Sequence, residues 1–372
     1  MAAVFFYISG HGFGHASRQI AIVNALGARA PEVEIVIRSS VPLTVFGRTL
    51  RVPARVEPGD CDTGVVQFDS LRLDEAETIC RADAFHAELP ARAAREAALL
   101  RRHEARLVIS DAPPLACEAA WAAGVPSVVV SNFTWDWIYE GYPAELGSAP
   151  ELIPHIRQAY GRAGGAWRLP MHGGFAAFEA ERIIDVPFVA RHARHDRATV
   201  RRTLGLPADR PIVLFSFGGF AVRDLDFDHL DCLPAYDVLL TSHEAAGVAA
   251  LDRPGVHVVP EQRIYESGFQ YEDLVAAADV VLTKPGYGII SECVANGPAI
   301  LYTSRGRFRE YEVLVDAMPA LLRCGYIDQI ELFQGRWRAP LDAVLARREP
   351  TAKPATDGAA RIAGMILEHL ER

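Results

Sequence analysis

Short apolar stretches alternate with longer amphipathic segments along the chain. In the first half, runs rich in β-branched residues predict strands at Val4 to Ile8, Val33 to Ile37, Leu107 to Ile109 and Ser127 to Val130. The segments between them, rich in Ala, Leu and Arg, predict helices at Ala16 to Leu26, Ala91 to Arg102 and Leu115 to Ala123. Strands that alternate with helices in this way are typical of a parallel sheet with crossover helices.

The same alternation starts again in the second half. The predicted strands are Ile212 to Phe217, Asp237 to Thr241, Val256 to Val259, Val280 to Leu282 and Ala299 to Tyr302. The predicted helices are Tyr271 to Ala278 and Gly288 to Asn296. The sequence therefore predicts an α/β fold built from two Rossmann-like halves.

The boundary between the halves is expected before the connector that begins at Val186-Pro187 and continues into the basic stretch Arg191 to Arg202. We place the two domains at residues 1–185 and 186–355. A last helix, Asp357 to Leu370 within residues 356–372, could pack back on the first domain.

The composition supports two well-packed domains. The chain has 372 residues, a length that exceeds what one compact core usually takes. Of these residues 50% are hydrophobic and 23% are charged. The net charge of -9 and the absence of a basic run argue against nucleic acid as a partner. Among 38 basic residues only Lys284 and Lys353 are lysines, so a lysine inside a glycine-rich motif stands out.

The sequence contains no apolar run of the roughly 18 to 20 residues that cross a membrane. Its first residues lack the basic region of a secretion signal and are interrupted by Gly10-His11-Gly12, so we expect a cytoplasmic protein. The six cysteines are scattered without metal-site spacing, and the acidic run Asp224 to Asp228 fits a solvated loop better than a metal site. We therefore expect no metal and no separate cofactor.

A glycine-rich turn, Gly10 to His15, follows the first predicted strand and precedes the first predicted helix. Gly12 and Gly14 would let a ligand approach the backbone, and the helix start offers unpaired N–H groups. His15 would lie in the first helical turn, where the positive helix end favours the neutral imidazole, the form that accepts a proton. A tight turn whose histidines bond only to backbone is an equally good interpretation. The even glycine spacing does not match the dinucleotide fingerprint, which disfavours a nicotinamide enzyme.

An aromatic segment follows the strand that ends near Val130. It places Trp135 and Trp137 on either side of Asp136. Indole faces stack well on sugar rings, and Asp136 could accept a hydroxyl proton or orient the base. The alternative is an amphipathic loop that fills the core, with Asp136 capping a helix.

Two glycine-rich turns mark the second half. Gly218 and Gly219 end a predicted strand and could form a small anion-binding concavity with their backbone N–H groups. A further turn, Lys284 to Gly288, stands between a strand and a helix, with Glu292 about one turn into that helix.

The turn from Lys284 to Gly288 suits a diphosphate. Its candidate ligands are Lys284, Gly286, Tyr287 and Gly288. Glycines permit close approach, the helix start is partly positive, and Lys284 adds a full charge. Glu292 could accept hydrogen bonds from both ribose hydroxyls. The alternative makes Glu292 a helix-dipole carboxylate and Lys284 a surface charge.

Taken in order, these motifs resemble a known family. GHGFGHASR, SNFTWDWIYE, VPFVARH and KPGYGIISE resemble the glycosyltransferase-like region that precedes the kinase module of plant arabinokinases, and related stand-alone bacterial proteins. The stretch AAADVVLTKPGYGIISE is similar, more distantly, to the undecaprenyl-diphospho-muramoylpentapeptide N-acetylglucosaminyltransferase family. The resemblance implies a GT-B fold: two facing Rossmann-like domains with an interdomain cleft, the donor mainly on the second domain and the acceptor on the first.

The resemblance also assigns residues by motif position. It implies that His15 is the histidine of the glycine-rich turn, Lys284 the basic residue before the loop, and Glu292 the ribose ligand. Glu310 stands where such enzymes contact donor-sugar hydroxyls. This chain departs from the distant family in having His11 in place of a glycine, so His11 competes with His15 for the role of base. No kinase module follows Arg372, so we expect no sugar phosphorylation.

The sequence therefore predicts a metal-independent glycosyltransferase. It would move a sugar from a nucleoside diphosphate sugar, with UDP expected, to a small-molecule or glycan acceptor, and His15 or Asp136 would deprotonate the acceptor. The rival interpretations are a nucleotide-sugar epimerase or hydrolase of the same fold, and a non-catalytic nucleotide-sugar-binding module. The sequence does not indicate an oligomeric state.

Overall fold

The computed structural model describes residues 3–218, 225, 227–242 and 253–371. Its first half contains a seven-stranded sheet in the order β3-β2-β1-β6-β7-β8-β9, in which every recorded pair of neighbouring strands is parallel. The strands are β1 (Ala3–Ile8), β2 (Glu34–Ser39), β3 (Arg55–Pro58), β6 (Ala105–Asp111), β7 (Ser127–Phe133), β8 (Gly165–Gly173) and β9 (Ile183–Asp185). A small antiparallel hairpin, β4 (Val66–Gln67) and β5 (Leu73–Asp74), lies apart from this sheet.

The second half contains a six-stranded parallel sheet in the order β12-β11-β10-β13-β14-β15. Its strands are β10 (Ile212–Ser216), β11 (Asp237–Thr241), β12 (Val256–Val259), β13 (Val280–Thr283), β14 (Ala299–Tyr302) and β15 (Cys324–Tyr326). The prediction of an α/β fold with two Rossmann-like halves is confirmed.

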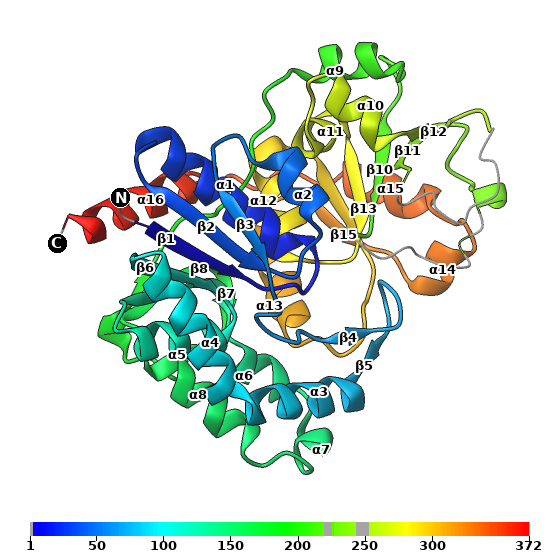
Figure 1. Ribbon diagram of the computed structural model, residues 1–372. Helices are drawn as coiled ribbons and strands as arrows, with labels where there is room; N and C mark the ends of the chain where they lie inside the picture. Colours follow the sequence, from blue (N-terminus) through cyan, green and yellow to red (C-terminus); the bar gives the residue numbers. More distant parts are fainter. Residues whose placement is uncertain (1–2, 219–224, 226, 243–252, 372) are drawn as a thin grey trace.

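Helices cover both sheets (Figure 1). In the first half these are α1 (Phe13–Arg29), α2 (Leu43–Thr49), α3 (Glu75–Ala87), α4 (Leu89–Arg102), α5 (Pro114–Ala123), α6 (Trp135–Tyr139), α7 (Pro143–Leu146) and α8 (Leu152–Gly161). After β9 they are α9 (Arg197–Leu204), α10 (Glu261–Glu266), α11 (Tyr271–Ala277), α12 (Tyr287–Asn296), α13 (Glu310–Leu321), α14 (Gln329–Phe333), α15 (Arg338–Leu345) and α16 (Gly358–Leu370). Short 3₁₀ turns occupy Ala180–Arg182 and Phe227–His229.

The central strands are buried on both faces. All residues of β1 and β13 are buried, which is why their sequences are almost continuously apolar and do not alternate. The sequence pattern missed β8, because Gly165 and Pro170 interrupt it. This strand nevertheless pairs with β7 on one side and β9 on the other, so its position in the sheet outweighs its weak local preference.

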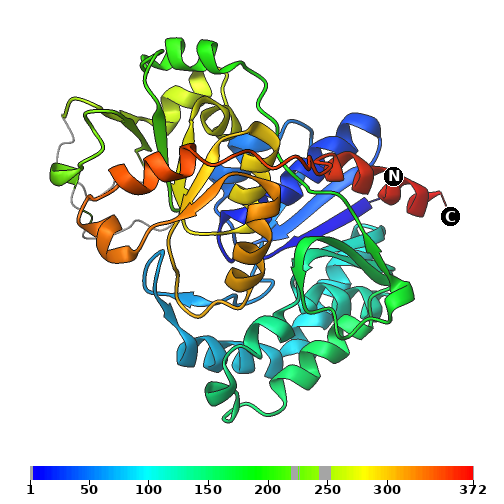
Figure 2. The same ribbon diagram turned by 180° about the vertical axis from the view of Figure 1, so that it is seen from behind.

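Two chain segments cross between the halves and lie side by side. One is the segment that follows β9, and the other is the returning segment that precedes α16. The backbone N–H of Phe188 in the first donates to the Ala355 carbonyl in the second at 3.1 Å, and Val189 forms an antiparallel bridge with Asp357. The returning segment then leads into α16 (Figure 2). That helix packs on α1, where Arg29 donates to the Ala360 carbonyl at 3.2 Å.

The halves also meet at the starts of two helices. Figure 1 shows α1 and α12 between the two sheets. A Cβ atom added to Gly288, in the first turn of α12, would lie 3.3 Å from the Cα atom of Gly14, in the first turn of α1. A side chain at Gly288 would therefore crowd this contact, so the glycine at this position serves the approach of the two halves.

Candidate functional site

A cavity of about 500 Å³ lies between the two halves. Both glycine-rich helix starts line it, as do residues of β10, the segment after β14, and α2. The cavity, which we call the cleft, brings together most of the residues that the sequence singled out: His11, Gly12, Gly14, His15, Gly218, Lys284, Gly286, Tyr287, Gly288, Glu292 and Glu310. Gly219 lies outside the described residues.

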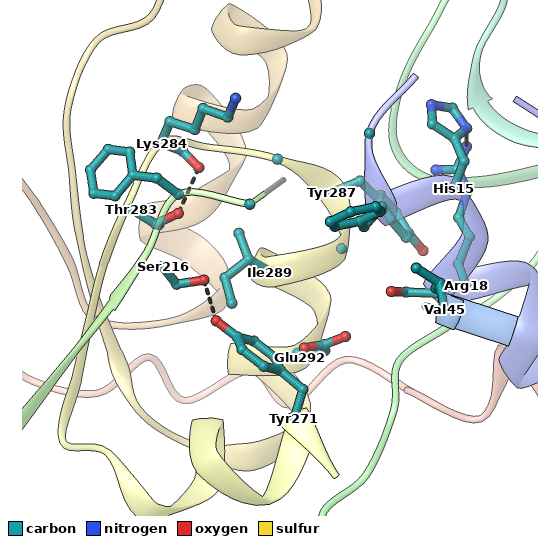
Figure 3. Close-up of a pocket in the computed structure, with 18 of the residues that line it drawn as sticks. His15, Arg18, Val45, Ser216, Tyr271, Thr283, Lys284, Tyr287, Ile289 and Glu292 are labelled. Atoms are coloured by element: carbon teal, nitrogen blue, oxygen red, sulfur yellow. Dashed lines mark hydrogen bonds between the residues drawn. The ribbon is translucent and has the colours of Figure 1, made fainter. Parts of the chain in front are cut away.

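Two helix N-termini face the cleft. Helix α1 begins after Gly12, whose φ of 74° is in the left-handed region that favours glycine, and His15 is the third residue of the helix. Helix α12 begins after Gly286. The first backbone N–H groups of a helix have no partner within it and carry partial positive charge. The cleft therefore offers two positive helix ends to one ligand (Figure 3).

A buried carboxylate that the sequence analysis missed, Asp111, lies behind His15. Asp111 ends β6 and is fully buried. It accepts from His15 Nδ1 at 2.9 Å, from Arg18 Nε at 2.6 Å and Nη2 at 2.5 Å, and from Gln19 Nε2 at 3.0 Å. Burial would raise its pKa, but the Arg18 guanidinium and His15 outweigh burial and hold it at about 2. Asp111 is thus ionised and can only accept hydrogen bonds.

These contacts fix the proton of His15. Arg18 Nη2 has two hydrogens, which are used by Asp111 and by Ser131 Oγ at 3.1 Å. Arg18 Nη2 also lies 2.9 Å from His15 Nδ1, but it has no hydrogen left to donate to that atom. Since an unprotonated Nδ1 would point its lone pair at a carboxylate, Nδ1 carries a proton, and in the neutral form of the ring the lone pair is on Nε2. His15 can then accept a proton through Nε2.

His11 has the opposite arrangement. Its Nδ1 accepts from the Val65 backbone N–H at 3.2 Å, which places its proton on Nε2. Burial, and then the neighbouring basic groups His15, Arg305 and Lys284, lower its pKa well below the usual value of 6.5. His11 is therefore a neutral hydrogen-bond donor and is poorly suited to accept a proton.

Arg18 extends the same network across the two halves. Its Nη1 donates to Asn132 Oδ1 at 2.6 Å, and Asn132 Nδ2 donates to Glu310 Oε1 at 2.7 Å. The guanidinium also lies over the Tyr287 ring, 5.2 Å from its centroid. These contacts join β7 and α1 of the first half to α13 and α12 of the second. The Tyr287 side chain is thereby buried in packing, and its backbone N–H is what remains for a ligand.

Lys284 and Glu292 line the cleft on the side of the second half (Figure 3). Burial, with the neighbouring Arg305 adding to it, lowers the pKa of Lys284 to about 7. Glu292 is buried and accepts from Arg191 at 2.7 Å (Nε) and 2.5 Å (Nη2), both on Oε1. Burial raises the pKa of Glu292 despite this partner. Among the described residues no recorded bond uses Oε2, so this oxygen can accept from a ligand hydroxyl.

The structure does not bring Asp136 into the cleft. Asp136 is fully buried and accepts from Arg157 Nε at 2.8 Å. Of the neighbouring indoles, Trp135 is buried and donates to Asp62 at 2.8 Å, and Trp137 stacks under Arg309. The segment thus fills the core of the first half, as the alternative interpretation expected, although Asp136 lies inside α6 and does not cap it. Of this region, Phe133 is the residue that lines the cleft.

Within the part of the chain that the structure describes, no group of three or more His, Cys, Asp or Glu side chains could hold a metal ion. The same residues contain no helix that is long and apolar enough to cross a membrane.

Comparison with known proteins agrees with this geometry. No family model matches the chain. L-arabinokinase of Arabidopsis thaliana is 29% identical over 382 residues, an alignment that covers 98% of this chain but only 34% of the relative. The chain therefore spans about a third of the length of the curated relative that it matches.

Three solved structures share the fold over nearly the whole chain. The glycotransferase of kitacinnamycin has a TM-score of 0.66 at 16% identity, covering 99% of this chain and 98% of its own. Phytolacca americana UGT2, in complex with UDP-2fluoro-glucose and pterostilbene, has a TM-score of 0.60 at 12% identity and covers 100% of both chains. A putative UDP-N-acetylglucosamine 2-epimerase from Listeria monocytogenes has a TM-score of 0.57 at 14% identity, covering 100% and 97%. The chain is therefore a homologue of about a third of the Arabidopsis L-arabinokinase, and it has the GT-B fold of these glycosyltransferases.

Proposed function

We propose that this protein is a metal-independent glycosyltransferase that moves a sugar from a nucleoside diphosphate sugar, with UDP expected, to a hydroxyl or amine of a small-molecule or glycan acceptor. The observation that supports this proposal most strongly is that His15, whose Nδ1 contacts Asp111, and the start of α12 line one cavity. His15 suits the acceptor, whose proton it would take, and the start of α12 suits the leaving diphosphate. The comparisons support a glycosyltransferase fold, and one structural neighbour, Phytolacca americana UGT2, was solved with UDP-2fluoro-glucose.

The proposed donor site lies in the second half, residues 186–355. The diphosphate would be held by the backbone N–H groups at the start of α12, by Lys284 and by the turn at Gly218. Oε2 of Glu292 would accept from the ribose hydroxyls, and Glu310 would contact hydroxyls of the sugar. Positive groups that are already in place where negative charge develops often supply the largest share of catalysis.

The acceptor would bind on the first half, residues 1–185. His15 Nε2 would take the acceptor proton as the acceptor atom attacks the anomeric carbon, and Asp111 would stabilise the imidazolium that forms. The bond from the anomeric carbon to the diphosphate oxygen then breaks, and its electron pair leaves on the nucleoside diphosphate. This single displacement inverts the anomeric centre. His11, with its proton on Nε2, would orient a substrate oxygen.

Incubation with radiolabelled UDP sugars tests this proposal. Release of UDP together with a new labelled glycoside is the expected result when a panel of alcohol, sugar and amine acceptors is supplied. Release of UDP with free sugar would identify a hydrolase, and a labelled isomer of the UDP sugar would identify an epimerase. Binding of UDP sugars without turnover would identify a binding module.

Replacement of Glu292 by alanine is expected to weaken UDP binding by roughly tenfold to a hundredfold, because hydrogen bonds to a charged group contribute about 1.5 to 3 kcal/mol. The measurement is calorimetric titration of UDP. Glu266→Ala, an exposed glutamate on α10 outside the cleft, is the matched control and should bind UDP like the wild type. Equal affinities in Glu292→Ala and the wild type would remove Glu292 from the donor site.

A further inference from the structure

Among the described residues four arginines line the cleft, and three of them face a carboxylate. Arg18 lies 2.5 Å from Asp111, Arg48 lies 2.7 Å from Glu261, and Arg191 lies 2.5 Å from Glu292. These three positive charges are thus compensated within the protein.

Arg305, on the segment between β14 and α13, is different. Its recorded contacts are a 3.3 Å hydrogen bond from Nη1 to the Pro285 carbonyl and the face of the Phe308 ring, 4.2 Å from its centroid. Over the described ranges, no carboxylate oxygen lies within 4.0 Å of its guanidinium, and its Nε is buried without a hydrogen-bond partner. Burial lowers its pKa, but an arginine stays charged in a protein. Among the described residues, the cleft therefore contains a guanidinium without a directly paired carboxylate, and Glu310 acts on it only through its longer-range charge.

The surroundings of Arg305 place this charge beside the proposed reaction centre. The Phe308 ring under the guanidinium stacks on His11, with centroids 5.5 Å apart, and the His11 ring lies 6.4 Å from that of His15. Arg305 thus lies between the two histidines, where the sugar and the acceptor would meet, and the turn from Lys284 to Gly288, whose Pro285 carbonyl it contacts. The diphosphate already has the start of α12 and Lys284.

We propose that Arg305 binds an additional anionic group, a carboxylate or a phosphate, that the substrate carries besides the donor diphosphate. This inference rests on the proposed function. The group would belong either to the transferred sugar, as in a nucleoside diphosphate uronic acid, or to the acceptor, as in a sugar phosphate. A planar guanidinium offers parallel N–H groups that match both anions, and such pairs are shorter and stronger than neutral hydrogen bonds.

The test is calorimetry on the wild type and on Arg305→Met, in two arms. The donor arm compares UDP, UDP-glucose and UDP-glucuronic acid. The acceptor arm titrates glucose, glucose 6-phosphate and inorganic phosphate into protein saturated with UDP. Arg307→Met is the matched control, because Arg307 is an exposed neighbour that pairs with Glu75 outside the cleft.

In the wild type we expect the acidic ligand of one arm to bind at least roughly tenfold more tightly than its neutral counterpart. The arm that shows this preference identifies the source of the anion. Arg305→Met should abolish the preference and keep UDP affinity within about twofold, while Arg307→Met should keep both. The melting temperature of Arg305→Met should not fall, because it removes a partly buried charge that has no paired carboxylate among the described residues.

Two results would overturn the inference while leaving the proposed function intact. One is the absence of any preference for the acidic ligand in both arms. The other is an equal loss of affinity for UDP, UDP-glucose and UDP-glucuronic acid in Arg305→Met, which would assign Arg305 to the diphosphate. If the wild type does not bind UDP at all, the proposed function fails and this inference fails with it.

Discussion

Replacement of His15 by alanine is expected to lower the turnover number for glycosyl transfer by roughly 10² to 10⁴-fold, the range that a general base contributes. The reason is that His15 lines the cleft and Asp111 holds its Nδ1–H, so that Nε2 of the neutral ring is the atom proposed to accept the proton. Nucleotide affinity should stay within about twofold, because the imidazole would act on the acceptor proton and not on the donor. Initial rates at saturating donor and acceptor, together with titration of UDP, measure both quantities.

His172→Ala is the control for this experiment, because His172 is exposed on β8 and does not line the cleft. It should retain the activity of the wild type. Full activity in His15→Ala, or the same fractional loss in His15→Ala and His172→Ala, would contradict the assignment of the base. Asp136→Asn should also remain active in protein that is folded, since Asp136 is buried against Arg157 and outside the cleft.

Replacement of Arg18 by methionine is expected to lower the free energy of unfolding by about 3 to 5 kcal/mol. It leaves Asp111 buried and ionised with two hydrogen-bond donors missing, and it also removes the partner of Asn132 and Ser131. Urea unfolding near neutral pH measures this loss. The contribution of Asp111 is fully present above the unfolded pKa of about 4 and is lost as the pH falls toward its folded pKa of about 2.

A surface pair supplies the control for Arg18. Arg168 pairs with Asp185, whose side chain is 67% exposed, so Arg168→Met should cost about 1 kcal/mol or less. The double variant Arg18→Leu/Asp111→Leu should lose less stability than Arg18→Met alone, because no unpaired charge stays buried. A loss in Arg18→Met no larger than in Arg168→Met would show that Asp111 does not depend on Arg18.

The sequence predicted the two halves and the placement of the glycine-rich turns because these features are local. Parallel strands that are buried on both faces give continuous apolar runs, and each turn stands directly between such a run and a helix. The confirmed fold then brings the turns together, since the carboxyl ends of parallel strands meet at one edge of each sheet. His15 lies in the first turn of α1 as expected.

The partners of these residues could not be predicted, because they depend on contacts between distant segments. The predicted strand ended at Ile109, whereas β6 continues to Asp111, which the sheet places opposite Ile8 and so next to the first glycine-rich turn. The sequence offered one indication of this residue: Asp111 is polar and stands just beyond the apolar run of the predicted strand. Similarly, the difference between His11 and His15 depends on Val65, and no spacing in the sequence links them.

The position of Asp136 could not be predicted for the same kind of reason. A carboxylate between two tryptophans is compatible with a sugar-binding loop and with a core helix, and the sequence left both open. The structure pairs Asp136 with Arg157 on α8, which buries the carboxylate away from the cleft. Conversely, Arg305 belongs to no motif, and the role proposed for it rests on the absence of a directly paired carboxylate among the described residues.

The most direct test of the proposed donor site is a crystal structure of the protein with UDP. We expect the diphosphate oxygens about 2.7 to 3.2 Å from the backbone N–H groups at the start of α12 and from Lys284 Nζ, with the ribose hydroxyls on Glu292 Oε2. Density for UDP outside the cleft, or an empty cleft in crystals grown with saturating UDP, would contradict the proposed function.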